Sequence, residues 1–292
     1  MGAVVPGAVT VGQPAPAPDD VQGTAPGDTL AVAHVSVRFG GLLALDDVSL
    51  AVEPGEVVGV IGPNGAGKTT LFNVISGFVQ PEAGALYWQG RRLRRLRPHD
   101  LARLGIARTL QGVGLWSGMS VVENAMTGAQ HALGADLASA LLGLWRSSGE
   151  EARTRRRAVE LLDRLGIGGW ADRSPDTLPY AVRKRVALAR ALMSEPRLLL
   201  LDEPASGLSP DEMDGLVELL GEVRRSTSVL LVEHHMDFVM AVCDRLVVLD
   251  FGQVIATGTP EEVRASPEVT TAYLGVAVEA GDGPEGPNGA QR

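Results

Sequence analysis

The sequence predicts an α/β domain with a mostly parallel core sheet and an inserted helical region. Two apolar runs indicate buried strands: residues 56–61 before a glycine-rich turn, and the four leucines 198–201 before Asp202. Continuous apolar runs of this kind are typical of parallel strands that are buried on both faces and joined by helices. Between about residues 112 and 182 the strand signals stop and helical periodicity replaces them. We therefore expect a layered domain in which helices cover the sheet.

The N-terminal part begins with three expected strands. Residues 31–38 alternate loosely between apolar and polar side chains, and residues 48–52 form a second strand. A Pro54-Gly55 turn separates them from the strand at 56–61, and a helix follows from about residue 71.

The next segment combines a short strand with a basic run. Residues 85–88 follow a turn at Gly84 and are expected to form an edge strand. Residues 91–97 then carry five arginines. A solvated face is the favoured interpretation of this run, and contact with an anionic lipid surface is the alternative.

The remaining elements follow from helical periodicity, apolar runs and turn residues. Helices are expected at residues 98–104, 121–130, 136–145, 150–165, 183–193, 210–225 and 237–243. Strands are expected at residues 106–110, 198–202, 228–232, 246–249 and 253–256. The segments 1–29 and 277–292 have compositions like those of disordered tails.

Composition excludes several classes of function. The chain of 292 residues has 26 basic and 35 acidic side chains, and its net charge of −9 argues against nucleic acid as the main partner. The single cysteine, Cys243, rules out an internal disulfide framework, fits a reducing compartment and is expected in the core. The sequence has neither an apolar run of membrane-spanning length nor a signal peptide. We therefore expect a cytoplasmic protein unless another chain holds it at a membrane.

The most specific motif lies between a predicted strand and a predicted helix, the context that a phosphate-binding loop requires. It follows the pattern G-x-x-x-x-G-K-[ST] and consists of Gly62, Pro63, Asn64, Gly65, Ala66, Gly67, Lys68, Thr69 and Thr70. The glycines let backbone N–H groups face one concavity, and the helix adds the positive end of its dipole. We expect Lys68 to reach the β- and γ-phosphates of a nucleoside triphosphate and the Thr69 hydroxyl to ligate Mg²⁺.

The lysine in this motif is informative in itself. Only Lys68 and Lys184 among the 26 basic residues are lysines, so the chain otherwise uses arginine. A compact ammonium suits a phosphate cradle. The choice of lysine therefore favours a phosphate loop over a glycine-rich turn with a chance cation.

A second group of candidate residues follows two buried strands. Asp202 ends the leucine run, so it lies at the C-terminal edge of the sheet, where ligands of open parallel sheets bind. It can hold Mg²⁺ directly or through water. Glu203 points in a different direction and is free to polarise a water molecule against the γ-phosphate. His234, at the end of another core strand, is a candidate to bond the γ-phosphate or order the water, and His235 is the adjacent competitor.

Taken together, these motifs resemble the ATP-binding subunit of an ABC transporter over residues 30–276. The resemblance implies an ABC-type P-loop ATPase with a mostly parallel core sheet, an antiparallel β subdomain and a helical subdomain at about 112–182. It also implies ATP and Mg²⁺ as cofactors.

The resemblance assigns roles to individual residues. Asp202 matches the Mg²⁺ aspartate, Glu203 the catalytic glutamate and His234 the switch histidine of the family. Gln111 matches the Q-loop residue that senses Mg²⁺ and the membrane partner. Phe39, which on its own could equally be a core residue, matches the aromatic side chain that stacks on adenine.

Further segments resemble a narrower group, the importers of branched-chain amino acids and their urea and amide relatives. These segments are residues 105–111, 119–124 and 258–275, and an apparent insertion around 131–148. The resemblance implies transmembrane permease subunits, a solute-binding protein in the complex, and a peripheral position on the inner face of the cell membrane. Relatives that export lipid or polysaccharide share much of the C-terminal pattern.

The sequence departs from the family at the signature, which is typically L-S-G/Y-G-Q. The residues that match it are Leu178, Pro179, Tyr180, Ala181 and Val182. In the family, the serine hydroxyl and the glycine amides bind the γ-phosphate held by the other subunit of a head-to-tail dimer. Here a proline, an alanine and a valine replace the hydroxyl, the second glycine and the glutamine, so the signature that this chain offers is expected to be weak.

This departure predicts that the chain works with a second, homologous ATPase subunit that carries an intact signature; a homodimer is the alternative. Ser209, where many family members have aspartate, is a milder departure. The alternative function is a nucleotide-binding regulatory or soluble ABC protein without a role in transport. Intact residues Glu203 and His234 argue against a regulatory module that does not hydrolyse ATP. A single cassette without long coiled coils argues against a soluble ABC protein that acts on ribosomes or DNA.

Overall fold

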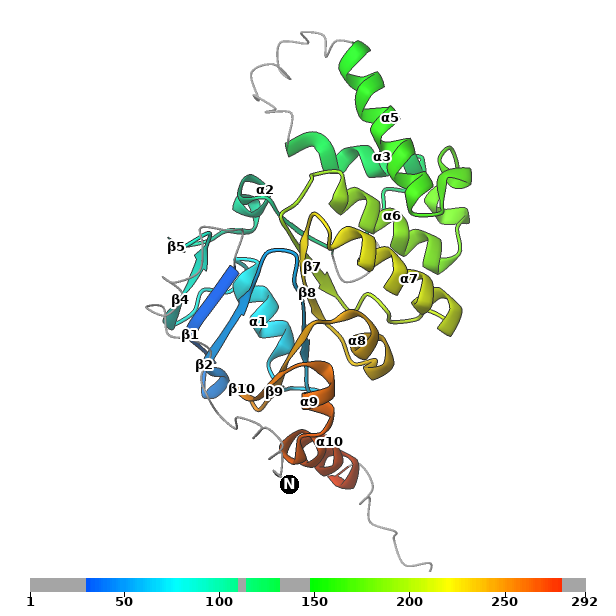
Figure 1. Ribbon diagram of the computed structural model, residues 1–292. Coiled ribbons are helices and arrows are strands. Elements are labelled where there is room, and N and C mark those ends of the chain that lie inside the picture. Colours follow the sequence, from blue (N-terminus) through cyan, green and yellow to red (C-terminus); the bar gives the residue numbers. More distant parts are fainter. Residues whose placement is uncertain (1–29, 110–113, 132–147, 280–292) are drawn as a thin grey trace, which may run out of the picture.

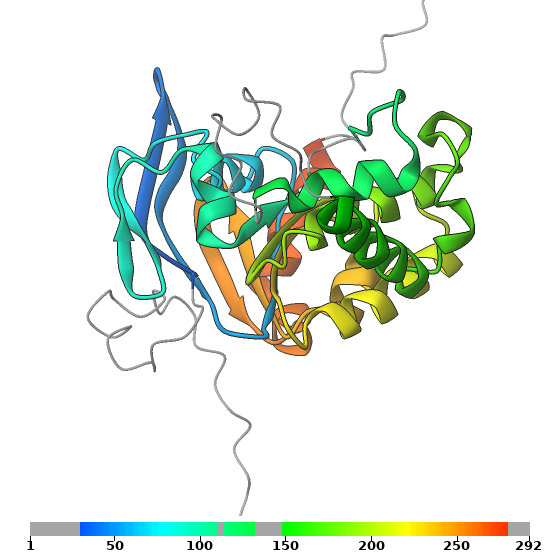
Figure 2. The same cartoon turned by 90° about the horizontal axis from the view of Figure 1, so that it is seen from above.

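The computed structural model describes residues 30–109, 114–131 and 148–279. A smaller and a larger β-sheet lie on either side of helix α1 (Lys68–Ile75), and most other helices gather beyond the larger sheet (Figure 1). The view from above shows the same succession of small sheet, large sheet and helices (Figure 2). The predicted α/β class is confirmed.

The smaller sheet is antiparallel throughout. Its strands are β1 (Leu30–Phe39), β2 (Leu42–Val52), β4 (Ala83–Trp88) and β5 (Arg91–Leu93), in the order β2-β1-β4-β5. The prediction that residues 85–88 form an edge strand is therefore wrong, because β4 lies between β1 and β5. Gln89 and Gly90 both have positive φ, at 51° and 71°, and this tight turn folds the arginine-rich segment back as the edge strand.

The larger sheet has the order β10-β9-β3-β8-β7-β6, and every neighbouring pair except β9 with β10 is parallel. Its strands are β3 (Val57–Ile61), β6 (Ile106–Arg108), β7 (Leu198–Asp202), β8 (Ser228–Val232), β9 (Arg245–Asp250) and β10 (Gln253–Gly258). All residues of β3, β7 and β8 are buried. The predicted mostly parallel core is confirmed.

Alternate residues of the core strands enter two separate hydrophobic clusters. Leu198 and Leu200 pack with α1 and the smaller sheet, whereas Leu199 and Leu201 pack with the helices on the opposite face. Successive strand residues point to opposite faces, and both faces here are covered. This explains why the strand before Asp202 is a continuous leucine run.

The helices on the opposite face all follow β6 in the chain. They are α3 (Val121–Met126), α5 (Ser148–Arg164), α6 (Tyr180–Leu192), α7 (Pro210–Val223), α8 (Met236–Val242), α9 (Pro260–Arg264) and α10 (Pro267–Glu279). Helix α2 (Leu101–Leu104) precedes β6, and single 3-10 turns are η2 (Pro98–Asp100), η3 (Thr127–His131), η4 (Gly168–Trp170) and η5 (Pro175–Thr177).

The described residues between β6 and α6 form helices and turns and contain no strand. The helix expected at 121–130 ends earlier, at Met126, and continues as η3. Gly128 in η3 packs directly on α6, where a Cβ would lie 1.8 Å from the Arg190 carbonyl oxygen. The expected helix at 136–145 lies outside the described residues.

The tails 1–29 and 280–292 lie outside the described residues, and the expected boundary at 276 falls inside α10. Cys243 is buried, as expected. Among the helices of the described residues, none combines the length and the apolar character needed to cross a membrane.

Candidate functional site

The phosphate-binding motif forms a tight loop between β3 and α1. Gly62, Gly65 and Gly67 have positive φ angles of 149°, 82° and 103°, a region that glycine adopts without steric cost. A Cβ on Gly62 would lie 2.0 Å from the Leu249 carbonyl oxygen, and one on Gly67 would lie 2.7 Å from the Ala44 carbonyl oxygen. The loop is therefore packed between β2 and β9, and these two positions admit only glycine.

Lys68 begins α1 and turns its side chain back into this loop. Its ammonium donates hydrogen bonds to the carbonyl oxygens of Gly62 at 2.6 Å and Pro63 at 2.7 Å. Burial lowers the pKa of Lys68, and the negative charge of Glu203 opposes that shift. The ammonium and the N–H groups of the first turn of α1 thus offer positive charge at this loop, which suits a phosphate.

The order of the strands brings the other candidate residues to the same edge. Strand β8 lies between β3 and β7 and is parallel to both, so the loops that follow the three strands are adjacent. The loop after β8 carries His234, and β7 ends at Asp202 with Glu203 next. The Nδ1 atom of His234 lies 3.8 Å from Oε1 of Glu203.

The two adjacent histidines share one neighbour, Glu233, because Nδ1 of His234 also lies 3.7 Å from its Oε2. Nδ1 of His235 lies 3.1 Å from Oε2 of Glu233, a carboxylate that is fully buried. The same carboxylate accepts hydrogen bonds from the backbone N–H groups of Ala205 at 2.6 Å and His234 at 2.9 Å. His234 therefore lies between Glu203 and Glu233, whereas His235 contacts Glu233.

The carboxylate of Asp202 is paired with Arg108, the last residue of β6. The same guanidinium donates to Oδ1 of Asn73 at 3.2 Å and lies over the rings of Phe72 and Phe78, at 5.5 and 5.6 Å from their centroids. Arginine over aromatic faces is a favourable arrangement for a cation removed from water. Arg108 thus supplies the positive charge next to Asp202 when no metal does so.

The residues present fit a magnesium ion. Magnesium prefers oxygen ligands and is usually held by one or two carboxylates together with phosphate oxygens. The bond to Arg108 uses Oδ2 of Asp202 and leaves Oδ1 for a further partner. Thr69, in the first turn of α1, is exposed, so its hydroxyl is open to a ligand.

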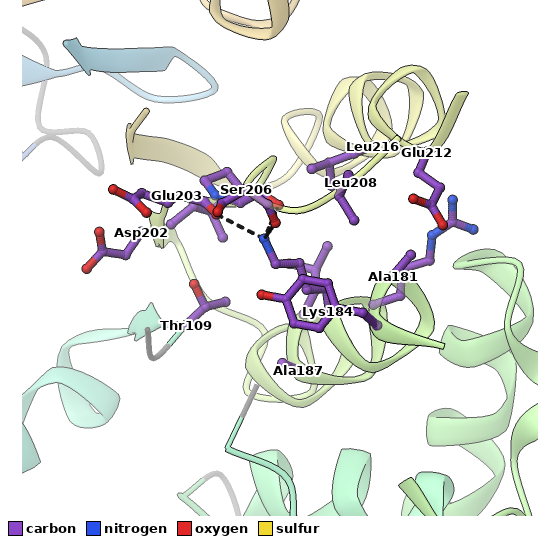
Figure 3. A pocket seen from close by; sticks show the side chains of 15 residues that line it. Thr109, Ala181, Lys184, Ala187, Asp202, Glu203, Ser206, Leu208, Glu212 and Leu216 are labelled. Atoms are coloured by element: carbon purple, nitrogen blue, oxygen red, sulfur yellow. Dashed lines mark hydrogen bonds between the residues drawn. The ribbon is translucent and has the colours of Figure 1, made fainter. Parts of the chain in front are cut away.

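A cavity of about 110 Å³ lies between α6, α7 and the loop after β7. Figure 3 shows Lys184 extending from α6 toward this loop. The carboxylates of Asp202 and Glu203 point away from the cavity. Glu203 has a positive φ of 47°, and its N–H donates to the Val232 carbonyl oxygen at 2.9 Å. A non-glycine residue in this conformation needs support from its surroundings.

The residues that match the family signature surround the start of α6. Pro179 is the N-cap of the helix and makes no side-chain cap hydrogen bond, whereas serine is among the preferred residues there. Tyr180 is exposed, and its ring lies 5.3 Å from the ammonium of Lys184. Leu178 is buried, and Ala181 and Val182 are half-buried in the first turn. The predicted helix start at 183 is thus too late, because α6 begins at Tyr180.

Ser209 is the N-cap of α7. Its N–H and hydroxyl both donate to Oε2 of Glu212, at 2.8 and 3.0 Å. Aspartate and serine are comparable N-cap residues. The helix start therefore accommodates the departure from aspartate at this position.

Two predicted site residues, Phe39 and Gln111, remain to be placed. Phe39 lies at the end of β1, and half of its surface (50%) is exposed, which leaves a ring face open to a partner. Gln111 lies outside the described residues.

The structure also brings in three residues that the sequence analysis assigned no role in the site: Arg108, Lys184 and Glu233. Arg108 and Glu233 share a signal that could have identified them. Each is a charged residue at the C-terminal end of a buried parallel strand, the same signal that singled out Asp202.

Comparison with known protein families gives two matches. The family described as "ABC transporter" matches residues 45–206. The family described as "Branched-chain amino acid ATP-binding cassette transporter" matches residues 253–279.

Several curated proteins are similar over nearly their whole length. The chain is 42% identical over 254 residues to the "High-affinity branched-chain amino acid transport ATP-binding protein BraF" of Pseudomonas aeruginosa, a match that covers 85% of this chain and 98% of that protein. It is 41% identical over 250 residues to LivG of Escherichia coli, described in the same words, with the same coverage. It is 34% identical over 247 residues to the "Lipopolysaccharide export system ATP-binding protein LptB" of Haemophilus influenzae, covering 84% of this chain and 97% of that protein.

Solved structures of ATP-binding cassettes are also similar to this chain. The ADP conformation of MJ1267, an ATP-binding cassette of an ABC transporter, superposes with a TM-score of 0.73 at 32% identity, covering 85% of this chain and 99% of that one. A dimeric post-hydrolysis state of the ATP-binding cassette MJ0796 bound to ADP and Pi superposes with a TM-score of 0.64 at 26% identity, covering 79% and 98%.

Proposed function

The chain belongs to the ABC transporter family, and from this premise we propose that it hydrolyses ATP to power the import of branched-chain amino acids or similar small polar solutes. The observation that carries the choice of solute is the set of relatives described as branched-chain amino acid transport proteins, at 41–42% identity over 98% of their length. The subunit of the lipopolysaccharide export system is less similar, at 34%. The C-terminal match at residues 253–279 supports the same narrower group.

Nucleotide is bound by the phosphate loop. We infer that the ammonium of Lys68 leaves the carbonyl oxygens of Gly62 and Pro63 and turns to the β- and γ-phosphates of ATP. The N–H groups at the start of α1 stabilise the same negative charge. Phe39, with its exposed ring, stacks on the adenine.

Hydrolysis requires a water molecule aimed at the γ-phosphate. In this proposal Glu203 polarises the water, and His234, 3.8 Å from the Glu203 carboxylate, contacts the γ-phosphate or orders that water. Thr69, Asp202 and Gln111 would hold Mg²⁺, which would supply positive charge to the phosphates.

The partners of this chain follow from the same proposal. It sits on the cytoplasmic face of the membrane against transmembrane permease subunits, and a solute-binding protein delivers the solute. The signature residues lack the serine hydroxyl and the second glycine, which in the family help to bind the γ-phosphate across the dimer, and they also lack the glutamine. The proposed complex therefore contains a second ATPase subunit with an intact signature, which gives one strong and one weak ATP site.

Reconstitution tests this function. The chain, its partner ATPase and the permeases are placed in lipid vesicles with the solute-binding protein, and uptake of labelled leucine is measured with and without ATP. Glu203→Gln should abolish both turnover and uptake and leave a nucleotide-bound dimer. Glu160→Gln, an exposed carboxylate of α5, is the control and should retain both. Equal turnover by the wild type and Glu203→Gln would contradict the assigned role.

The subunit stoichiometry has its own test. ATP turnover is measured for the isolated chain and for its mixture with the homologous subunit. Turnover that appears only in the mixture supports the heterodimer. Vigorous hydrolysis by the isolated chain would mean that a homodimer is the working form.

A further inference from the structure

Lys184, the second of the two lysines in the chain, makes an unusual set of contacts with the backbone. From the second turn of α6 its ammonium donates to three carbonyl oxygens of the loop after β7: Glu203 at 3.0 Å, Pro204 at 2.9 Å and Ser206 at 2.5 Å. Figure 3 shows this side chain reaching across the cavity to the loop. An ammonium has three N–H donors, so each of them has an acceptor here.

The loop that Lys184 holds contains a strained residue. Glu203 adopts a left-handed conformation with φ of 47°. Its N–H is fixed by the Val232 carbonyl oxygen of β8, and its carbonyl oxygen accepts from Lys184. Such a conformation persists when neighbouring groups determine it from several sides. Lys184 thus makes one of these two long-range hydrogen bonds of the Glu203 backbone, and the Ser206 N–H donates a local one to the same carbonyl oxygen at 3.2 Å.

The opposite side of the loop faces a buried negative charge. Glu233 accepts a hydrogen bond from the Ala205 N–H at 2.6 Å. The loop peptides thus direct carbonyl oxygens at a cation and an N–H at an anion. Burial lowers the pKa of Lys184, and the charges of Glu233 and Glu203 oppose this shift. Peptide groups that lie between opposite charges are held in one orientation, so the peptide planes of this loop resist rotation.

We propose that Lys184 is a positioning residue that fixes the backbone of Glu203 and thereby aims its carboxylate at the reacting phosphate. The inference rests on the proposed function, because it takes Glu203 as the group that polarises the water. The lysine belongs to α6, the helix whose start carries the signature residues 178–182. A movement of α6 relative to the core sheet therefore reaches the Glu203 peptide through one side chain.

The identity of the side chain supports this role. Arginine is the default cation of this chain, yet the cations at 68 and 184, which bond two and three backbone carbonyl oxygens, are lysines. Three convergent carbonyl oxygens match a compact ammonium whose donors point in three directions. The planar fork of a guanidinium does not match them.

The test compares Lys184→Met with the wild type in the complex that contains the partner subunit and permeases. The methionine keeps the apolar stem and removes the donors. We expect kcat for ATP to fall at least about tenfold while KM and the affinity for Mg²⁺-nucleotide stay within about twofold, the signature of an interaction needed for the chemical step alone. Arg156→Met, an exposed cation of α5, is the matched control and should change neither.

A second measurement reports on the loop itself. Hydrogen exchange of the full chain should accelerate at residues 203–208 in Lys184→Met and remain unchanged at the phosphate loop, since local opening reflects local support. Lys184→Arg keeps the charge and replaces Lys184→Met in both measurements if the methionine variant does not fold. It should also lower kcat and accelerate exchange in the same segment.

The outcomes separate this inference from the proposed function. Wild-type kcat in Lys184→Met, or a loss of nucleotide affinity equal to the loss of kcat, overturns the positioning role. Unchanged exchange at residues 203–208 overturns it as well. If Glu203→Gln itself turns over ATP like the wild type, the proposed function has failed instead.

Discussion

The carboxylate of Asp202 and the guanidinium of Arg108 form an ion pair that is almost closed to solvent. Nη2 of Arg108 lies 3.1 Å from Oδ2 of Asp202, and the two side chains are 12% and 2% exposed. A buried charge without its partner is costly, and removing one member of such a pair typically costs 3–5 kcal/mol. Since Asp202 is the proposed magnesium ligand, Arg108 stabilises the aspartate in the absence of the metal.

Arg108→Met should therefore destabilise the nucleotide-free chain by about 3 kcal/mol. Urea unfolding measures the free energy of unfolding, and Mg²⁺-ADP should reduce the difference from the wild type because the ion supplies the missing positive charge. Arg155→Met is the matched control. Its ion pair with Asp172 is exposed, at 48% and 84%, and such pairs contribute about 1 kcal/mol or less. Equal losses in the two variants would contradict the importance of the buried pair.

A second prediction concerns the pH dependence of nucleotide binding. Burial lowers the pKa of Lys68 in the free protein from the ordinary value of 10.5, and phosphates in contact with the ammonium would raise it again. Below the lowered pKa, Lys68 is charged in both states and affinity is independent of its titration. Above that pKa, binding must take up a proton, so affinity falls as pH rises.

Calorimetry checks this coupling between nucleotide binding and proton uptake by Lys68. The binding enthalpy of nucleotide measured at alkaline pH should vary with the ionisation enthalpy of the buffer, and the sign should indicate proton uptake. Lys68→Met should bind nucleotide more weakly and should lose this buffer dependence. A wild-type protein that showed no proton uptake on the alkaline side would contradict the assignment to Lys68.

The sequence predicts best those features whose pattern lies within one continuous segment of the chain. The strand, turn and helix around Lys68 and the leucine run before Asp202 each carry their own pattern, and the structure has both elements, although α1 begins at Lys68 rather than at the expected residue 71. Parallel pairing of the buried strands follows from the apolar runs, because such strands need cover on both faces.

The features that the sequence missed depend on long-range contacts or short elements. Arg108 and Asp202 are 94 positions apart, and no local pattern links a strand-end arginine to one particular carboxylate. Strand β5 has only three residues, two of them arginines, so it has no apolar periodicity to identify it. That is why β4 was expected at the edge of the smaller sheet.

The glycines of the phosphate loop give a third prediction. Gly62→Ala would place a Cβ 2.0 Å from the Leu249 carbonyl oxygen at a φ of 149°, so the loop must move away from β9. We expect a loss of at least about 2 kcal/mol of unfolding free energy and at least a tenfold loss of nucleotide affinity. Gly41→Ala is the control, since a Cβ there meets nothing within 4 Å, and it should stay within about 0.5 kcal/mol of the wild type. Similar losses in both variants would show that the effect is general rather than due to the loop.

The signature provides the last prediction. Pro179→Ser, Ala181→Gly and Val182→Gln together restore the hydroxyl, the unhindered backbone and the amide at the start of α6. Serine is also a better N-cap than the proline that now makes no cap hydrogen bond.

Hydrogen bonds to a charged group contribute about 1.5–3 kcal/mol each, and about 1.4 kcal/mol corresponds to a factor of ten. The isolated triple variant should therefore gain at least about tenfold in ATP turnover, measured as phosphate release, because each copy can now complete the site of the other. Adding Glu203→Gln to the triple variant should remove the gain. Unchanged turnover would mean that the replaced residues do not limit hydrolysis, and the case for a partner with an intact signature would be lost.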